Sequence, residues 1–174
     1  QLSLDIKLQQ YAEKLLKNKR GAVVAIEPST GEILTMVTAP AYNPQILTLH
    51  NKDRGTAHRD LINNEQKPLF NRATMAAYPP GSLFKPFVGL IAQQEGTLNP
   101  NRTISCSGAY YFNGQRLTGC HGHPTCRSLS DAVQHSCNTY FVTVFRETID
   151  QFGQNSPTAG LDTFNAYLER FGMG

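Results

Sequence analysis

The sequence of 174 residues predicts an α+β fold, and three observations support this prediction. First, apolar side chains recur at helical spacing in several separate stretches of the chain. Second, residues 21–38 contain two short β-branched, apolar runs joined by a turn, as expected for a β-hairpin. Third, the chain has the length of one ordinary domain and enough apolar sequence to bury a core. Because a two-stranded sheet is rarely stable alone, we expect the hairpin to pair with further strands.

The first helix is predicted over residues 4–17, where apolar side chains fall on one face and charged side chains on the other. Gly21 ends this helix and begins the hairpin, whose strands are predicted at 21–27 and 32–38 with a Pro-Ser-Thr-Gly turn between them. Residues 40–68 are polar and rich in turn-forming residues. We therefore expect a long surface segment there, of the kind that often carries function.

The second half of the chain is predicted to be mainly helical. Pro86 is tolerated in the first turn of a helix, because the backbone N–H groups there lack partners inside the helix. The sequence Ser-Leu-Ser-Asp at 128–131 has the form of a capping box. Residues 101–127 are rich in Gly, Cys, His and Tyr and show little periodicity. The predicted helices of this half cover residues 87–96, 128–136, 139–149 and 161–171, with Gly172 ending the last.

Composition excludes several classes of protein. A hydrophobic content of 40% and a charged content of 17% are globular values, so disorder is not expected. The net charge of +3 is scattered rather than gathered in a basic stripe, which gives no support for nucleic-acid binding. There is no apolar run of about 18 residues that could span a membrane. The chain opens directly in a helical pattern, and we expect it to be a piece of a longer protein.

The sequence Pro-Pro-Gly-Ser-Leu-Phe-Lys-Pro at 79–86 raises a question of chemistry. Residues three apart lie on one face of a helix, so Ser82 and Lys85 are predicted to lie within reach of each other. Ser82 could simply cap the helix, with Lys85 solvated in the first turn. A cation there opposes the helix dipole, however, and N–H groups at a helix N-terminus can hold a developing oxyanion. A free lysine has a pKa of about 10.4, so burial or a second cation must lower the pKa of Lys85 before it can act as a base.

Ser136 and Asn138 stand two residues apart at the junction of two predicted helices. Serine and asparagine at such junctions often cap helices, and the residues alone leave that interpretation open. The order of the two pairs is more specific. A Ser-x-x-Lys sequence followed about fifty residues later by Ser-x-Asn resembles the first two active-site motifs of the penicillin-binding proteins and serine β-lactamases.

The resemblance extends along nearly the whole chain. Residues 21–44 resemble the opening hairpin of the transpeptidase domain in class B penicillin-binding proteins, and residues 71–86 resemble the segment that carries their nucleophile. Residues 135–141 and 167–174 fit the same family. The chain is identified as a member of the elongation-type class B penicillin-binding proteins, the penicillin-binding protein 2 group. The resemblance implies that residues 1–174 are the N-terminal portion of one transpeptidase domain, in which antiparallel strands accompany a helical subdomain.

The resemblance also implies a reaction, the cleavage of a D-Ala–D-Ala peptide bond in a peptidoglycan stem peptide. Carried over to this sequence, Ser82 is the nucleophile, and a second peptide's amine resolves its acyl-enzyme into a cross-link. Lys85 accepts the proton of Ser82, and Ser136 relays a proton to the leaving amine. Asn138 hydrogen bonds to the substrate amide and to Lys85. β-Lactam antibiotics are expected to acylate the same serine.

The family's setting is implied in the same way. The partners expected are stem peptides, β-lactams and proteins of the wall-elongation complex, and the chemistry needs no cofactor. The expected location is the periplasmic face of the cytoplasmic membrane, held by an anchor that these residues do not contain.

One family motif is missing from the sequence. A Lys-Thr-Gly or Lys-Ser-Gly strand binds the substrate carboxylate in the family and supplies part of the oxyanion hole, and neither sequence occurs here. We therefore expect a partial transpeptidase fold, like that of penicillin-binding proteins and serine β-lactamases, because the chain stops before the third motif. Little or no activity is expected of this piece alone, since one lost oxyanion donor costs about 10² to 10³ in rate.

Four cysteines allow either two disulfides or a metal site. Tetrahedral zinc takes four Cys or His ligands, and residues 120–126, Cys-His-Gly-His-Pro-Thr-Cys, are dense in both. The family works outside the cytoplasmic membrane, where disulfides persist. A disulfide model, however, leaves the two histidines that follow Cys120 without a role.

Some elongation-type relatives carry a zinc ion close to the active site, with the last ligand at the middle position of the second motif. The ligands that this resemblance implies for a structural zinc ion are Cys106, Cys120, His123 and Cys137. Cys126 is then free, and His121 is an alternative to His123. The remaining histidines, expected on the surface or in loops, are His50, His58 and His135.

Two functions from other classes are alternatives. A β-lactam-sensing or binding module uses the same first two motifs and is acylated without turnover, but sensors do not usually carry the additional Cys/His segment. A small zinc-stabilised interaction domain would be stable without further residues and would not react with penicillin. A hydrolytic β-lactamase is disfavoured, because no glutamate lies in an obvious deacylation motif.

Overall fold

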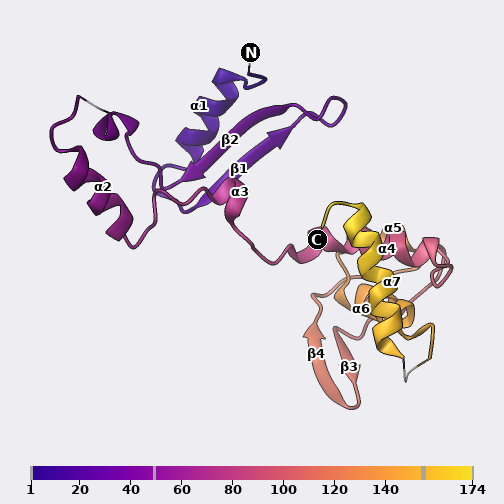
Figure 1. Cartoon of the computed structure of the whole chain (residues 1–174). Helices are drawn as coiled ribbons and strands as arrows, with labels where there is room; N and C mark the ends of the chain where they lie inside the picture. Colours follow the sequence, from indigo (N-terminus) through magenta and orange to yellow (C-terminus); the bar gives the residue numbers. More distant parts are fainter. Residues whose placement is uncertain (1, 49, 154–155, 174) are drawn as a thin grey trace. The chain divides into compact units, whose positions relative to one another are not determined.

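The computed structural model describes residues 2–48, 50–153 and 156–173. The chain divides into two compact units, residues 1–78 and 79–174, called here the N-terminal unit and the C-terminal unit. Each unit is described by itself (Figure 1). Over the described residues, none of the helices combines the length and the apolar character needed to cross a bilayer.

A helix lies against a β-hairpin in the N-terminal unit. Helix α1 (Ile6–Leu15) begins at Asp5, whose side chain accepts hydrogen bonds from two backbone N–H groups of the first turn. Strands β1 (Gly21–Ile26) and β2 (Ile33–Ala39) pair antiparallel. The predicted hairpin is therefore confirmed, and the predicted helix is confirmed with narrower bounds. Gln9 joins α1 to β2, because its side-chain oxygen accepts from Thr35 Oγ1 at 2.6 Å and from the Met36 N–H at 3.0 Å.

The segment after the hairpin lies on the surface, as predicted, but it is not irregular throughout. It contains the 3₁₀ helix η1 (Pro44–Leu47) and helix α2 (Arg54–Asn63), and α2 buries no residue. The sequence did not predict α2, because this helix has no apolar face to produce a periodic pattern. A short helix, α3 (Arg72–Met75), follows and packs against β1 and β2.

The C-terminal unit is mainly helical, with one small hairpin. Its elements are η2 (Gly81–Phe84), α4 (Lys85–Gln94), β3 (Ala109–Phe112), β4 (Gln115–Gly119), α5 (Leu129–Gln134), α6 (Asn138–Asp150) and α7 (Pro157–Arg170). Helices α4, α6 and α7 pack together around a core that includes Ile91, Tyr140, Val144 and Phe164. At the crossing of α6 and α7, Gly160 lies against the backbone of Ile149. A Cβ added at Gly160 would fall 1.9 Å from the Ile149 carbonyl oxygen, so only glycine permits this approach.

The helices predicted in this half are confirmed with shifted ends. The capping serine before α5 is confirmed, since Ser128 Oγ accepts a hydrogen bond from the Asp131 N–H at 3.1 Å. Helix α4 begins two residues earlier than predicted and α7 four residues earlier, each with a proline in its first turn. Residues 101–127 show little periodicity in the sequence, yet they contain an antiparallel hairpin of β3 and β4, which the sequence did not predict. Its turn residues, Asn113 and Gly114, both have positive φ, which favours a tight two-residue turn.

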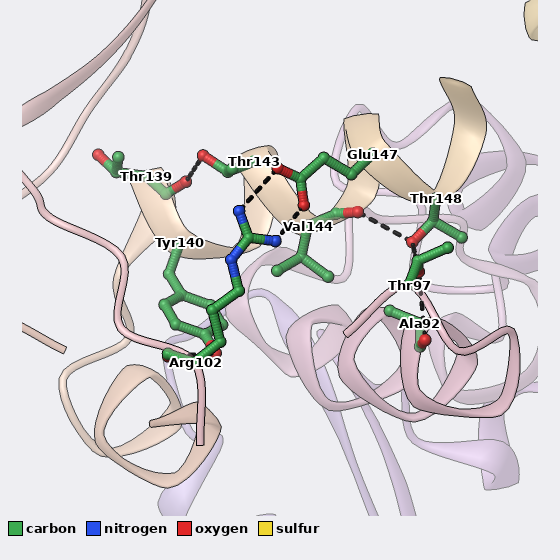
Figure 2. Close-up of polar contacts among 9 residues, drawn as sticks. All are labelled: Ala92, Thr97, Arg102, Thr139, Tyr140, Thr143, Val144, Glu147 and Thr148. Carbon is green, nitrogen blue, oxygen red and sulfur yellow. Dashed lines mark hydrogen bonds and ion pairs between the residues drawn. The ribbon is translucent and has the colours of Figure 1, made fainter. Parts of the chain in front are cut away.

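Polar contacts fix α6 to the segment that follows α4 (Figure 2). Arg102 forms a two-pronged ion pair with Glu147, and the Tyr140 hydroxyl donates to the Arg102 carbonyl at 3.2 Å. At the residue after Glu147, the hydroxyls of Thr148 and Thr97 lie 2.8 Å apart. Because α6 carries the second motif at its N-terminus, these contacts set the position of that motif against α4.

Candidate active site

Ser82 lies in η2, immediately before α4, and its side chain is exposed. The preceding Gly81 has φ +60°, a conformation that favours glycine after the two prolines. Ser82 does not cap α4. The residue at the cap position is Phe84, and no side chain makes a capping hydrogen bond there. The hydroxyl of Ser82 instead accepts a hydrogen bond from Lys85 Nζ at 3.2 Å.

Three side chains from two segments meet at this point. Lys85 Nζ donates to Ser136 Oγ at 2.8 Å and to the Ser136 carbonyl at 2.6 Å. Ser136 Oγ in turn donates to Ser82 Oγ at 2.9 Å. Each of the three polar groups therefore contacts the other two. This arrangement lets a proton on Ser82 reach Lys85 either directly or through Ser136.

Ser136 holds its position with a strained backbone. Its φ is +49°, a left-handed conformation that non-glycine residues rarely adopt. The residue lies between α5 and α6, and its N–H donates to the Val133 carbonyl at 3.0 Å while the Cys137 N–H donates to the Ala132 carbonyl at 3.0 Å. Strain of this kind persists where surrounding contacts impose it, and it concentrates at functional sites. The cap interpretation does not describe Ser136, since α6 is capped by Cys137 through a hydrogen bond from the Tyr140 N–H.

Asn138 is the first residue of α6, and its side chain contacts β4. Its Nδ2 donates to the Gly119 carbonyl at 2.8 Å, and its backbone N–H donates to Cys120 Sγ at 3.3 Å. The family resemblance implied a hydrogen bond between Asn138 and Lys85, and among the described contacts there is none. The two residues do line one pocket of about 350 Å³, so the amide lies beside the reacting groups without touching the lysine.

Burial lowers the pKa of Lys85, because the half-buried ammonium loses solvation. Negative charge on Cys120 or Cys137, in the thiolate form, acts in the opposite direction and raises the pKa of Lys85. Its hydrogen-bond partners are neutral serine oxygens rather than a carboxylate, so among the described residues no salt bridge holds the proton on Lys85. A lower pKa increases the neutral fraction of Lys85, the form that can accept the serine proton.

A cluster of three thiols and one imidazole includes Cys137, the middle residue of the second motif. The ligand atoms of its four residues all lie within 4.8 Å of one another, and the residues are Cys106, Cys120, His123 and Cys137. Cys120 Sγ lies 3.3 Å from His123 Nε2 and 3.9 Å from Cys137 Sγ. A tetrahedral zinc ion with bonds of about 2.3 Å to sulfur and about 2.0 Å to nitrogen separates such pairs by about 3.5 and 3.8 Å. The four residues thus fit a zinc ion in ligand type and in spacing.

His123 presents the correct nitrogen to this cluster. Its Nδ1 lies 2.6 Å from the Pro124 carbonyl, which can only accept, so Nδ1 carries the hydrogen and Nε2 keeps a free lone pair. His121 lies elsewhere, with Nε2 at 2.9 Å from the His135 carbonyl. Cys126 is fully buried, and its carbonyl accepts from the Ile104 N–H at 3.1 Å. Neither residue belongs to the group of four, although Cys126 Sγ lies 3.8 Å from His123 Nδ1.

The thiols differ in their ease of ionisation. Burial acts to raise the pKa of Cys120, but hydrogen bonds from the backbone N–H groups of Asn138 and Thr139 and from neighbouring thiols lower it overall. Burial dominates at Cys137 and raises its pKa. All four cysteines are free thiols in the structure. The cluster thus has one thiol predisposed to bind a cation as thiolate and others that a cation would have to deprotonate.

The model of the penicillin binding protein transpeptidase domain matches residues 21–174. The chain belongs to this family. The peptidoglycan D,D-transpeptidase MrdA of Haemophilus influenzae is 32% identical over 182 residues, which cover 99% of this chain and 25% of MrdA. The chain thus spans about a quarter of the length of this curated relative.

Two solved structures of the same family are similar to the chain. Penicillin-binding protein A of Mycobacterium tuberculosis, a penicillin G acyl-enzyme complex, has 33% identity and a TM-score of 0.72, over 85% of this chain and 37% of the other. Penicillin-binding protein 2 of Helicobacter pylori, in complex with MreC, has 29% identity and a TM-score of 0.75, over 93% of this chain and 29% of the other. The predicted family and the α+β transpeptidase fold are confirmed.

Sequence reasoning missed the contribution of β4 to this candidate site. The end of β4 supplies the Gly119 carbonyl for Asn138, and the hairpin thereby places Cys120, the next residue, at the cluster. The signal that could have revealed it was Asn-Gly at 113–114 between two short strand-like runs. His135 was expected in a loop or on the surface. It is the C-terminal cap residue of α5, and its ring stacks on that of His123 with 5.5 Å between the centroids. His50 and His58 are exposed, as expected.

Proposed function

We propose that residues 1–174 are the N-terminal portion of the transpeptidase domain of an elongation-type peptidoglycan D,D-transpeptidase. The observation that carries this proposal is the contact of Lys85 Nζ with both Ser82 Oγ and Ser136 Oγ. The family match and the covalent penicillin G complex of the mycobacterial relative support it. β-Lactams acylate Ser82 in this proposal, because their strained ring imitates the scissile peptide bond.

The reaction begins with neutral Lys85. Lys85 takes the Ser82 proton as Ser82 Oγ attacks the carbonyl of the D-Ala–D-Ala peptide, so that a C–O bond forms and the carbonyl becomes a tetrahedral oxyanion. The proton then passes from Lys85 through Ser136 Oγ to the leaving nitrogen, and the C–N bond breaks. D-Alanine departs as an amine and Ser82 carries the acyl group.

The second half reverses these proton movements. The acceptor peptide's amine attacks the Ser82 ester, and its proton passes through Ser136 to Lys85. The C–O bond breaks, Ser82 regains its proton from Lys85, and an amide cross-link is the product. Asn138 binds the substrate amide beside this path, with its orientation fixed by Gly119.

Only one of the hydrogen-bond donors expected to stabilise the oxyanion lies within this sequence. The Ser82 N–H lies at the start of the η2–α4 segment and contributes one donor, while the family's Lys-Thr/Ser-Gly strand is not among these residues. Since one donor is worth about 10² to 10³ in rate, the 174 residues alone are expected to be nearly inactive.

The proposed zinc ion is structural and takes no part in any of these steps. Its ligands are Cys106, Cys120, His123 and Cys137, and the metal would tie β4 to the loop that carries Ser136 and Asn138. The Cys120 sulfur accepts a hydrogen bond from the Asn138 N–H, and Cys137 lies between Ser136 and Asn138 in the sequence. Loss of the metal is therefore expected to disorder that loop.

The cellular setting is proposed from the relatives. The Helicobacter pylori structure is a complex of penicillin-binding protein 2 with MreC, which supports wall-elongation proteins as partners here. The corresponding location is the periplasmic face of the cytoplasmic membrane, with any anchor outside these residues.

The test is covalent labelling of the full-length protein by benzylpenicillin, followed by intact mass. We expect one added penicillin per chain, its loss in Ser82→Ala, and a large loss in Lys85→Gln. Cross-linking of two stem peptides distinguishes the transpeptidase from the alternative sensor module, which is acylated without turnover. A full-length protein that never reacts with penicillin would support the zinc-stabilised interaction domain instead.

A further inference from the structure

The peptide group between His135 and Ser136 is anchored at both ends. Its N–H, which belongs to Ser136, donates to the Val133 carbonyl at 3.0 Å, at the end of α5. Its carbonyl, which belongs to His135, lies 2.9 Å from His121 Nε2. A carbonyl can only accept, so His121 Nε2 carries the hydrogen and donates it. Backbone carbonyls at a helix C-terminus lack partners inside the helix, and His121 supplies one from the segment that follows β4.

This peptide group controls the backbone strain of Ser136. The angle φ of Ser136 is the rotation about its N–Cα bond, which joins this peptide plane to the rest of the residue. Its value of +49° lies in the left-handed region, which is unfavourable for residues with a Cβ. A peptide group without its carbonyl anchor could turn and let φ relax to a negative value. The same rotation would carry Ser136 Oγ away from Lys85 Nζ, at 2.8 Å, and from Ser82 Oγ, at 2.9 Å.

His121 is held by its neighbours rather than by the core. Its side chain is exposed, so the ring contributes little to core packing. The ring meets that of His123 edge-on with 5.9 Å between centroids, and His123 stacks on His135 with an interplanar angle of 6°. The three rings thus join the segment after β4 to the end of α5. His121 is not one of the four clustered ligand residues, and its Nε2 is engaged by the carbonyl instead.

We propose that His121 is a positioning residue for the proton relay. This proposal rests on the transpeptidase function proposed above, in which Ser136 passes the proton. By donating to the His135 carbonyl, His121 holds the peptide plane that keeps Ser136 in its left-handed conformation. The Ser136 hydroxyl then stays between Lys85 Nζ and Ser82 Oγ. The alternative is a hydrogen bond that only completes the end of α5, and such a role would not depend on the Ser136 hydroxyl.

The test is benzylpenicillin acylation of the full-length protein, with the binding constant and the acylation rate constant measured separately by stopped flow. We expect His121→Ala to lower the acylation rate constant about two- to tenfold, the range of one net hydrogen bond, and to leave the binding constant unchanged. His121→Gln should restore most of the rate, because its amide nitrogen lies as many bonds from Cα as the histidine Nε2 and also donates. His58→Ala is the control, since it removes an exposed histidine of the N-terminal unit.

The same substitution in a Ser136→Ala background separates positioning from a purely structural role. Without the hydroxyl there is no relay left to position, so His121→Ala should cost no further rate in that background. The same fold loss in both backgrounds would indicate a structural role and overturn the proposal. A zinc content that falls in His121→Ala would also overturn it, because His121 would then be a metal ligand.

The remaining outcomes decide the proposal as well. A loss in His121→Ala that His121→Gln restores, and that disappears in the Ser136→Ala background, supports the positioning role. An unchanged acylation rate constant in His121→Ala, or an equal loss in His121→Gln or His58→Ala, overturns it and leaves the transpeptidase assignment intact. If benzylpenicillin does not acylate the unsubstituted protein, the transpeptidase function fails, and the positioning role fails with it.

Discussion

Replacing Ser136 by alanine and, separately, by glycine separates its two contributions to the molecule. Both variants lose the hydroxyl that lies 2.8 Å from Lys85 Nζ and 2.9 Å from Ser82 Oγ. Both keep the carbonyl that accepts from Lys85 at 2.6 Å, so the lysine retains one anchor. The variants differ only in how well they tolerate φ +49°.

The magnitudes follow from these contacts. Loss of a positioned proton relay costs about 10² to 10⁴ in rate, and we expect the same loss of acylation rate in both variants. The left-handed conformation costs a non-glycine residue about 1–2 kcal/mol and costs glycine little. We therefore expect Ser136→Gly to be more stable than Ser136→Ala by about 1 kcal/mol, or about 2–4 °C in Tm.

The assay is stopped-flow acylation by a fluorescent penicillin, with thermal unfolding of the same preparations. Asn18 offers a matched control, since its φ is +60° and it lies in the other unit. Asn18→Gly should exceed Asn18→Ala in stability while neither changes acylation. Equal stability of the two Ser136 variants would refute the strain argument. Near-normal acylation in Ser136→Ala would refute the relay.

Three further predictions concern packing, protonation and metal. Gly160→Ala should lower the Tm by about 3–10 °C in a thermal melt, because the new methyl group meets the backbone of α6. Gly55→Ala is the control and should raise the Tm slightly, because Gly55 lies in helix α2 with open space around it and alanine favours a helix more than glycine does. The acylation rate should rise with pH to an apparent pKa below about 10.4, because burial favours neutral Lys85, and a flat rate profile would contradict this. Between the lowered pKa of Lys85 in the folded chain and its ordinary pKa in the unfolded chain, the unfolded chain binds more protons, so the unfolding free energy should also rise with pH. Elemental analysis should find about one zinc ion per chain, which Cys120→Ser should lose and Cys126→Ala should keep. A protein with neither zinc nor free thiols in a thiol count would have disulfides instead.

The reactive motifs could be predicted from the sequence because their chemistry is local. The Pro-Pro-Gly bend places Ser82 one turn before Lys85, and spacing alone predicts that contact. The meeting of Lys85 with Ser136 is a tertiary contact, which no local rule supplies. It was expected only because the order of the two motifs resembles a known family.

The β3–β4 hairpin shows where pattern reasoning failed. Its exposed strand residues do not alternate between apolar and polar, so the period-two signal of a half-buried strand is absent. Its turn carries the information instead, in Asn113 and Gly114. The contact of Gly119 with Asn138 could not be predicted either, because a backbone carbonyl leaves no trace in the sequence.

The position of Cys137 has a spectroscopic consequence. Its neighbours on either side face the acylation site, while its own buried sulfur faces the thiol cluster. Cobalt(II) accepts the tetrahedral N/S ligand sets that suit zinc, and its visible absorption depends on ligand geometry. With cobalt in the proposed site, a displacement of Ser136 during acylation would change the coordination geometry at Cys137, the metal ligand that follows it in the sequence. The colour of the protein would then report each step at Ser82 without a labelled antibiotic.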